Sequence, residues 1–321
     1  MNPTRRALTL ATASAALAPA FAQAAYPNRP IRIVIGFTPG GGVDFSARLL
    51  AAKLSELLGQ NVIVENRPGA GTNIANELVA KAPPDGYTLL MNTSAVTINM
   101  SLYKKPGFDV ARDFAPVGIF SESQNILAVN ANKPYKSVAE LIAAARAAPG
   151  SLSYASAGSG STQHLVAELF KQATNTDILH VPYKGSAPAT TALLSGEVDI
   201  VFINIPALLQ HIKSGRVRSL AVAGGKRSAL LPDAPTLKEA SVNVTETVWY
   251  GLLAPISTQK EVVRKLSDAL VVAAKAPDMR ARLQDQGAEP VGNTPDEFGA
   301  ILKDEVPKWS RVIRAAGIVA E

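Results

Sequence analysis

The sequence contains no cysteine, only three histidines and few aromatic residues. The lack of cysteine excludes disulfides, thiolate chemistry and zinc–thiolate sites. The histidines, His164, His180 and His211, are too scattered to indicate a metal centre, so we expect no metal and no cofactor. Aromatic residues make up 6% of the chain and no run of basic residues occurs. We therefore expect no nucleic-acid partner.

The N-terminus has the pattern of a secretory signal peptide. A basic start ending at Arg5 and Arg6 precedes an apolar stretch over residues 7–20, which is too short to span a membrane. Two A-x-A patterns follow, and we expect cleavage after Ala24. The paired arginines fit an ordinary export signal better than a twin-arginine signal. Cleavage would lower the formal charge from +6 to +4, and the cysteine-free remainder suits a bacterial periplasm.

Hydrophobic residues at 47% and charged residues at 18% describe a globular protein whose 321 residues allow two domains or one large one. Strand patterns and helix patterns alternate, often with a glycine-rich turn between them. This predicts an α/β fold with doubly wound, mainly parallel sheets and helices on both faces. The expected strands are residues 31–35, 61–65, 87–92, 125–130, 154–155, 178–181, 198–203, 217–223 and 249–254. The expected helices are residues 44–58, 72–81, 162–173 and 187–194, with further helices starting at capping-box patterns at Ser137, Thr258 and Thr294.

Two of these strands, residues 125–130 and 249–254, are interpreted as crossings between two halves of the chain. Residues 25–126 and 251–321 would then form domain 1, and residues 127–250 would form domain 2. A cleft between the two domains follows from this arrangement.

The first candidate site is the run Thr38-Pro39-Gly40-Gly41-Gly42 between a strand and a helix. It is not a P-loop, because Gly42 stands where the phosphate-binding lysine is required. It is not a dinucleotide fingerprint either, because Phe45 stands where a small residue is required. What remains is an anion site made by free amides at a helix start. The alternative is a tight turn in which the glycines are needed only for the backbone angles that the turn requires.

The second candidate site runs from Ser156 to His164 and also joins a strand to a helix. The hydroxyls of Ser156, Ser161 and Thr162, with the loop amides, predict a second anion cradle. A serine hydrolase using Ser159 or Ser161 with His164 is a much weaker alternative. G-x-S-x-G is not matched, and no acidic partner is evident nearby. His164 is interpreted as a structural residue in preference to a ligand contact.

Two further loops follow predicted strands. Lys184 could pair with a substrate carboxylate or could be an ordinary solvated lysine. Asn204 could bind a ligand or could simply end a buried strand. All four sites lie at carboxyl ends of strands, where doubly wound sheets present their binding groups. No triad, carboxylate pair or metal cluster joins them, so binding is favoured over catalysis and the chain is not expected to be an enzyme.

A series of motifs runs through the mature sequence: Pro39-Gly40-Gly41 with Asp44 and Arg48, Val64-Glu65-Asn66-Arg67-Pro68-Gly69-Ala70-Gly71, Pro84-Asp85-Gly86-Tyr87, Tyr154-Ala155-Ser156 with His164-Leu165, His180-Val181-Pro182-Tyr183-Lys184-Gly185, and Leu231-Pro232-Asp233-Ala234-Pro235-Thr236. Through these motifs, over essentially the whole mature sequence, the chain resembles the Bug-type periplasmic solute receptors, the substrate-binding components of tripartite tricarboxylate transporters.

The resemblance implies a two-domain type II periplasmic-binding-protein fold with a carboxylate in the interdomain cleft. Two loops, residues 37–42 and 156–162, would hold the carboxylate as a pincer through amides, hydroxyls and water. The expected partners are a small organic carboxylate and the small and large membrane subunits of a transporter, with the receptor a monomer. A sensor feeding a signalling partner would use the same binding chemistry. The expected ligand-binding residues are Phe37, Thr38, Gly40, Gly41, Gly42, Asp44, Ser94, Ser156, Gly158, Ser159, Gly160, Ser161, Thr162, His164, Lys184 and Asn204.

One position departs from the family pattern. Many relatives carry an aspartate between the phenylalanine and the asparagine of the strand-end motif, where this chain has Ile203. The absence of that aspartate argues against a ligand with an amino group. Together with Phe37 beside the first loop, it favours a mono- or dicarboxylate with an apolar body, aromatic bodies included.

Overall fold

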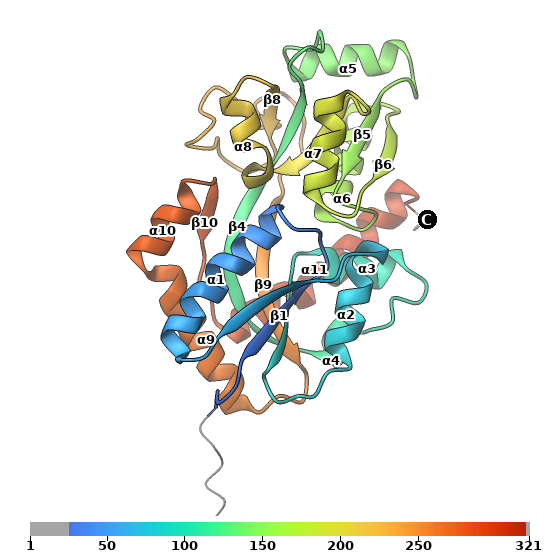
Figure 1. The fold of residues 1–321 in the computed structure, drawn as a ribbon. Helices are drawn as coiled ribbons and strands as arrows, with labels where there is room; N and C mark the ends of the chain where they lie inside the picture. The colour runs from blue at the N-terminus through green and yellow to red at the C-terminus, as the bar shows by residue number, and fades with distance from the viewer. Residues whose placement is uncertain (1–25, 319–321) are drawn as a thin grey trace, which may run out of the picture.

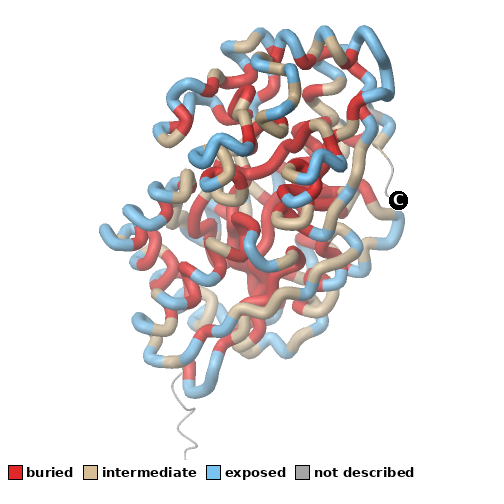
Figure 2. Tube along the Cα trace, turned by 45° about the horizontal axis from the view of Figure 1, so that its top comes forward, coloured by how far each residue is buried: buried red, intermediate tan, exposed pale blue. Residues whose placement is uncertain are grey.

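The computed structural model describes residues 26–318, so the expected signal peptide and its cleavage site after Ala24 lie outside the described residues. The chain forms two lobes, each built around a sheet with helices on both faces (Figure 1). Buried residues run through the middle of both lobes, while exposed residues lie mainly along the outer helices and loops (Figure 2). In the part of the chain described, no helix combines the length and apolar character needed to cross a membrane.

The first lobe contains strands in the order β2-β1-β3-β9-β4, and β10 also pairs with β4. β1 is parallel to β2 and β3, whereas β9 is antiparallel to its neighbours. The strands are β1 (Ile31–Ile35), β2 (Val62–Asn66), β3 (Thr88–Asn92), β9 (Thr247–Pro255) and β10 (Ala288–Pro290). One face carries α1 (Gly42–Leu58), α9 (Lys260–Lys275) and α10 (Pro277–Gln284). The other face carries α2 (Asn73–Ala80), preceded by the short η1 (Ala70–Thr72), with α3 (Ala95–Leu102), α4 (Val110–Asp113) and α11 (Pro295–Ala316).

The second lobe contains strands in the order β4-β7-β5-β6, with β8 also paired to β4. β5 is parallel to β6 and β7. The strands are β5 (Ser153–Ser156), β6 (Leu179–Pro182), β7 (Ile200–Asn204) and β8 (Val217–Val222). One face carries α5 (Val138–Ala147) and α6 (Thr162–Thr174), and the other carries α7 (Ser186–Ser195) and α8 (Ile205–Lys213). The predicted α/β fold with helices on both faces of the sheets is confirmed.

A single long strand, β4 (Phe114–Asn130), belongs to both lobes. Its residues 114–124 pair with β9, and its residues 125–130 pair with β7 and β8. The expected crossing strand is therefore only the second half of β4. The other expected crossing, β9, pairs from Thr247 onward with strands of the first sheet. The division into residues 25–126 with 251–321 and residues 127–250 stays a prediction.

Local sequence signals place several helix ends correctly. α1 ends at Gly59, which has φ +67° and closes the last turn through its amide. Thr294 forms the predicted capping box with Glu297 at the start of α11. The capping box predicted at Thr258 is wrong, because Gln259 is the N-cap residue of α9 and makes no side-chain cap hydrogen bond. Ser137 makes half of its capping box, since Glu140 accepts from the amide of Lys136 instead.

Candidate functional site

The first glycine loop runs from the end of β1 to the start of α1. Gly41 occupies the N-cap position and offers no side-chain cap, so the first amides of α1 lack that partner. Gly40 has φ +88°, a region that favours glycine. A Cβ on Gly42 would lie 2.9 Å from the side-chain amide of Asn204 and closer still to the Tyr250 hydroxyl. Gly42 is therefore needed because two buried polar side chains approach its backbone.

Asp44 holds this loop in place from the first turn of α1. Its carboxylate accepts hydrogen bonds from the Gly40 amide at 3.1 Å, from Arg48 at 3.0 Å and from Asn66 at 3.0 Å. Burial raises the pKa of Asp44, but these hydrogen bonds outweigh it and keep the pKa below its usual value. The carboxylate therefore stays charged, and its hydrogen bonds tie the Gly40 amide of the loop to Arg48 of α1 and Asn66 of β2.

The second glycine loop runs from β5 to α6 and is built in the same way. Ser161 is the N-cap of α6, and its hydroxyl accepts the His164 amide at 3.2 Å. Gly158 and Gly160 have φ of +125° and +80°. The Thr162 hydroxyl at the first helical position is fully buried and has no hydrogen-bond partner. This loop thus also ends at a helix N-terminus, where amides favour an anion.

Two imidazoles, of the buried His164 and the half-buried His180, support the second loop. His164 Nδ1 accepts a hydrogen bond from the Gly160 amide at 3.2 Å, and His180 Nε2 lies 2.7 Å from the Ser156 hydroxyl oxygen. The pKa of His164 is lowered to about 4 and that of His180 to about 3, chiefly by burial. Both rings are therefore neutral near pH 7. The interpretation of His164 as a structural residue agrees with these contacts.

This arrangement does not fit a serine nucleophile. His164 uses Nδ1 on a backbone amide, not on the hydroxyl of Ser159 or Ser161. His180 does meet Ser156, yet within residues 26–318 no carboxylate hydrogen bonds to either ring. A triad needs an acidic group to orient its histidine. Over the same residues, no group of His, Asp and Glu side chains could hold a metal ion.

The two glycine loops belong to different lobes, and the lobes meet beside them. The Thr38 amide donates a hydrogen bond to the Lys184 carbonyl oxygen at 3.1 Å. The Tyr103 hydroxyl, from the first lobe, donates to the Ser159 carbonyl at 3.4 Å. Lys184 joins the site through its backbone, because its side chain is exposed. The lobes therefore meet beside both glycine loops, and we call the region between these loops the cleft.

The floor of the cleft contains three polar side chains on strands. Asn125 of β4 stands opposite Asn204 of β7, and Tyr250 of β9 reaches Gly42. The exposed fractions of Asn125, Asn204 and Tyr250 are 0%, 1% and 0%. Both polar atoms of the Asn125 side chain and the Asn204 Oδ1 have no hydrogen-bond partner. We call these three residues the cleft floor.

Sequence reasoning found Asn204 but missed Asn125 and Tyr250. An asparagine inside a buried strand is a signal that could have pointed to Asn125, because an unpaired buried amide is costly. Tyr250 lies in an apolar strand and carries no comparable signal.

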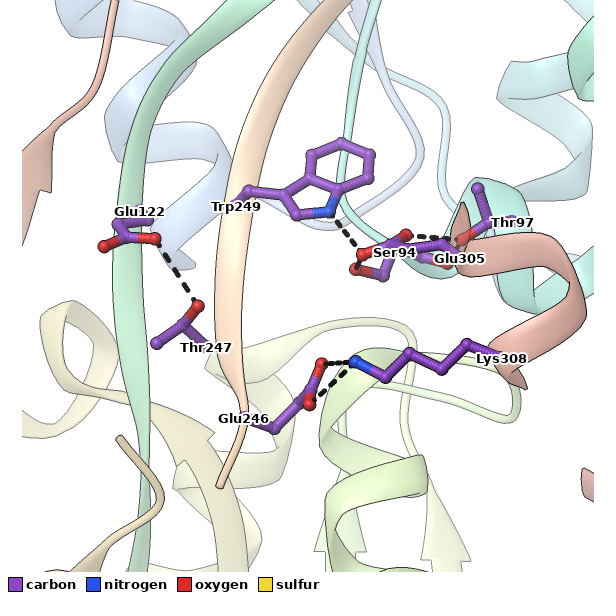
Figure 3. A network of polar contacts seen from close by, with 8 residues as sticks. All are labelled: Ser94, Thr97, Glu122, Glu246, Thr247, Trp249, Glu305 and Lys308. Atoms are coloured by element: carbon purple, nitrogen blue, oxygen red, sulfur yellow. Dashed lines mark hydrogen bonds and ion pairs between the residues drawn. The ribbon is translucent and has the colours of Figure 1, made fainter. Parts of the chain in front are cut away.

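Ser94, an expected ligand-binding residue, and Ile203, which departs from the family pattern, are both fully buried. Ser94 donates to Glu305 at 2.9 Å, and the same carboxylate accepts from Thr97 at 2.7 Å and from Trp249 Nε1 at 2.8 Å (Figure 3). This network ties α3 and β9 to α11. Ile203 packs in the apolar core under α7 and α8. It therefore gives no information about the ligand.

A pocket of about 370 Å³ opens beside the first glycine loop. Its lining comes from α1, from the N-terminal end of α8 and from α10 with its following turn. The residues are Gly40, Gly41, Asp44, Phe45, Arg48, Leu49, Pro206, Arg282 and Gln286. It shares Gly40 and Gly41 with the first glycine loop, and no residue of the second glycine loop lines it.

Residues 46–318 match the family model described as the tripartite tricarboxylate transporter family receptor. The chain belongs to this receptor family. Solved structures agree with the assignment. The periplasmic binding protein BugD is 34% identical, with a TM-score of 0.88 over 92% of this chain and 100% of its own. The receptor is thus of the Bug type, with the two-domain fold of periplasmic binding proteins.

Two similar structures contain carboxylates. Rpa4515 from R. palustris, solved with adipate, is 38% identical, with a TM-score of 0.89 over 92% of this chain and 100% of its own. MatC from Rhodopseudomonas palustris, solved with bound malate, is 31% identical, with a TM-score of 0.86 over 90% of this chain and 100% of its own. Two proteins similar to this chain over their whole length have therefore been solved with small carboxylates.

Proposed function

We propose that this receptor binds a small organic carboxylate, which can be a mono- or dicarboxylate with an aliphatic or aromatic body, between its two glycine loops. The observation that carries the proposal is that two glycine-lined helix N-termini, of α1 and α6, stand on different lobes beside the contacts that join those lobes. Amides and hydroxyls there are neutral donors suited to an anion. Each such bond to a charged acceptor contributes roughly 1.5–3 kcal/mol. A micromolar affinity needs about 8 kcal/mol, so several bonds with apolar burial suffice.

We assign the expected residues to two roles. Asp44, Ser94 and His164 hold the loops and helices in position through the contacts described above, and Lys184 acts through its carbonyl group. The residues proposed to face the ligand are Phe37, Thr38, Gly40, Gly41, Gly42, Ser156, Gly158, Ser159, Gly160, Ser161, Thr162 and Asn204. None of them is assigned a catalytic step.

The proposed destination of the ligand is a membrane transporter. The family description names receptors of tripartite tricarboxylate transporters, and BugD is a periplasmic binding protein. We infer that the chain is exported to the periplasm, acts as a monomer and delivers its ligand to small and large membrane subunits. Deleting the gene should abolish uptake of the bound acid by cells, and unchanged uptake would count against delivery.

The binding proposal is tested with purified chain that has been unfolded and refolded to remove bound ligand. A panel pairs each acid with its neutral amide, for example benzoate with benzamide and adipate with adipamide. Thermal unfolding is measured for every member at one pH. An acid at one hundred times its dissociation constant should stabilise the fold by about 2.7 kcal/mol. A panel in which no acid raises the melting temperature more than its amide would reject the proposal.

A further inference from the structure

The cleft floor is built differently from the two glycine loops. Asn125 and Asn204 are directly opposite each other in an antiparallel pair, so their side chains project from the same face of the sheet. A Cβ added to Gly42 would lie 2.9 Å from the side-chain amide of Asn204 and closer still to the Tyr250 hydroxyl. The two side chains therefore approach the same point. Three strands from both lobes thus bring two carboxamides and a phenol together beside the start of α1.

The carboxamides are not needed to pair their strands. The Asn125 carbonyl accepts the Ala223 amide at 2.8 Å, and β4 pairs with β7 through backbone groups. Yet both side-chain polar atoms of Asn125 and the Asn204 Oδ1 are buried without a partner. Buried polar groups are normally hydrogen-bonded because leaving them unpaired is costly. These atoms therefore indicate an interaction with something outside the chain.

The floor carries no formal charge. Among the described residues, the buried acidic side chains are Asp44 and Glu305, and the carboxylate oxygens of both accept hydrogen bonds from the partners described above. Burial raises the pKa of Tyr250, with a smaller opposing effect from Ser123, so its phenol stays protonated. Arg48, a cation beside the first glycine loop, is paired with Asp44.

A carboxamide offers one acceptor and one pair of donors whichever way it is turned. An ionised carboxylate can satisfy the donors, but its oxygens would oppose the amide oxygens of Asn125 and Asn204. A hydroxyl or a carboxamide on the ligand can donate to those oxygens and accept from the amide nitrogens or the phenol. Sites built to pair a polar group discriminate strongly when the matching group is missing.

We propose that the cleft floor of Asn125, Asn204 and Tyr250 is a neutral subsite that selects a second ligand group able both to donate and to accept hydrogen bonds. The preferred substrate is then a monocarboxylate whose far end carries a hydroxyl or a carboxamide. A second ionised carboxylate is disfavoured at that end. This inference rests on the proposed function, because the glycine loops must hold the first carboxylate.

The test is isothermal titration of the refolded wild-type chain with two matched series. The first comprises butyrate, 4-hydroxybutyrate, succinamate and succinate, and the second comprises hexanoate, 6-hydroxyhexanoate, adipamate and adipate. In the better-binding series, the hydroxy or amide member should bind at least tenfold more tightly than both the plain acid and the dicarboxylate. This comparison needs no variant, so it does not depend on the folding of a mutant.

The Asn125→Leu variant then locates the effect. For each protein, the affinity for the hydroxy or amide member is divided by the affinity for the plain acid. This ratio should be at least tenfold lower in Asn125→Leu than in wild type. Ser219→Ala is the matched control, because the Ser219 hydroxyl on β8 is also buried without a partner but lines a different pocket. That control should keep the wild-type ratio. If Asn125→Leu weakens the binding of all members of a series equally, the subsite is overturned.

The outcomes separate the two proposals. If the dicarboxylate or the plain acid binds as tightly as the hydroxy and amide members, the subsite is overturned while carboxylate binding stands. If no member of either series binds and no acid of the thermal panel does, the proposed function is overturned and the subsite with it.

Discussion

His164 and His180 stack face to face behind the second glycine loop, with ring centroids 4.1 Å apart and planes inclined by 8°. Tyr154 continues the stack at 4.8 Å from His180. His164 accepts a hydrogen bond from the Gly160 amide, and His180 lies within hydrogen-bond distance of the Ser156 hydroxyl. The loop is thus braced by neutral rings, and its geometry depends on their remaining unprotonated.

The stability of the chain should therefore fall as the pH drops from about 6.5 toward 4. In this window unfolded histidines take up protons, while His164 and His180, whose pKa values are lowered to about 4 and about 3, do not. The variant His164→Asn keeps an acceptor near the Gly160 amide and removes one titrating ring. Between pH 7 and pH 4.5 it should lose about 2 kcal/mol less unfolding free energy than wild type. Urea unfolding at both pH values measures this, and equal losses would contradict it.

Replacing Glu305 by glutamine should destabilise the fold. The carboxylate accepts from Ser94, Thr97 and Trp249, and an amide nitrogen in place of one oxygen would face donors in a buried site (Figure 3). We expect a loss of about 2–3 kcal/mol in unfolding free energy. Glu261→Gln, at an exposed position of α9, is the control and should change it by less than about 0.5 kcal/mol. Similar values for the two variants would show that the network contributes little.

Adding a methyl group at Gly42 should weaken ligand binding. The new Cβ would collide with the Tyr250 hydroxyl and the Asn204 side chain, so the loop or the floor must move. Gly42→Ala should lower the affinity for the best acid of the panel roughly tenfold or more. In Gly299→Ala the Cβ would make an ordinary contact with Pro116 at 3.5 Å, and its affinity should match wild type. Isothermal titration of both variants with that acid measures the two affinities. Unchanged affinity in Gly42→Ala would show that Gly42 does not contribute to ligand binding.

Asp44→Asn should loosen the first loop. It removes the charge that attracts Arg48 and weakens the bond from the Gly40 amide. A loss of about 1–2 kcal/mol in unfolding free energy is expected at pH 7. Because the pKa of Asp44 is lowered in the folded chain, this contribution exists above its usual pKa and disappears as the pH falls through the folded value. The difference between wild type and variant should therefore shrink in strong acid. Asp304→Asn, an exposed residue of α11, is the control and should behave like wild type at every pH.

Much of the fold follows from local patterns. The β-branched run of β1, the glycine turn after it and the close of α1 at Gly59 are all short-range signals, and each was predicted from the residues alone. The first half of β4 was missed because Pro116, Gly118 and several polar residues dilute its strand pattern. Its register against β9 contains two irregularities, which tertiary pairing accommodates and a sequence pattern does not show.

The site divides in the same way. The two glycine loops can be predicted from the residues alone, since glycines between a strand and a helix start predict free amides and a close approach to the backbone. Which groups approach that backbone depends on the tertiary structure. β4 extends through both sheets and sets Asn125 opposite Asn204, while β9 carries Tyr250 to Gly42. Side-chain period and propensity act over a few residues, whereas the meeting of these side chains depends on strand register between distant segments of the chain.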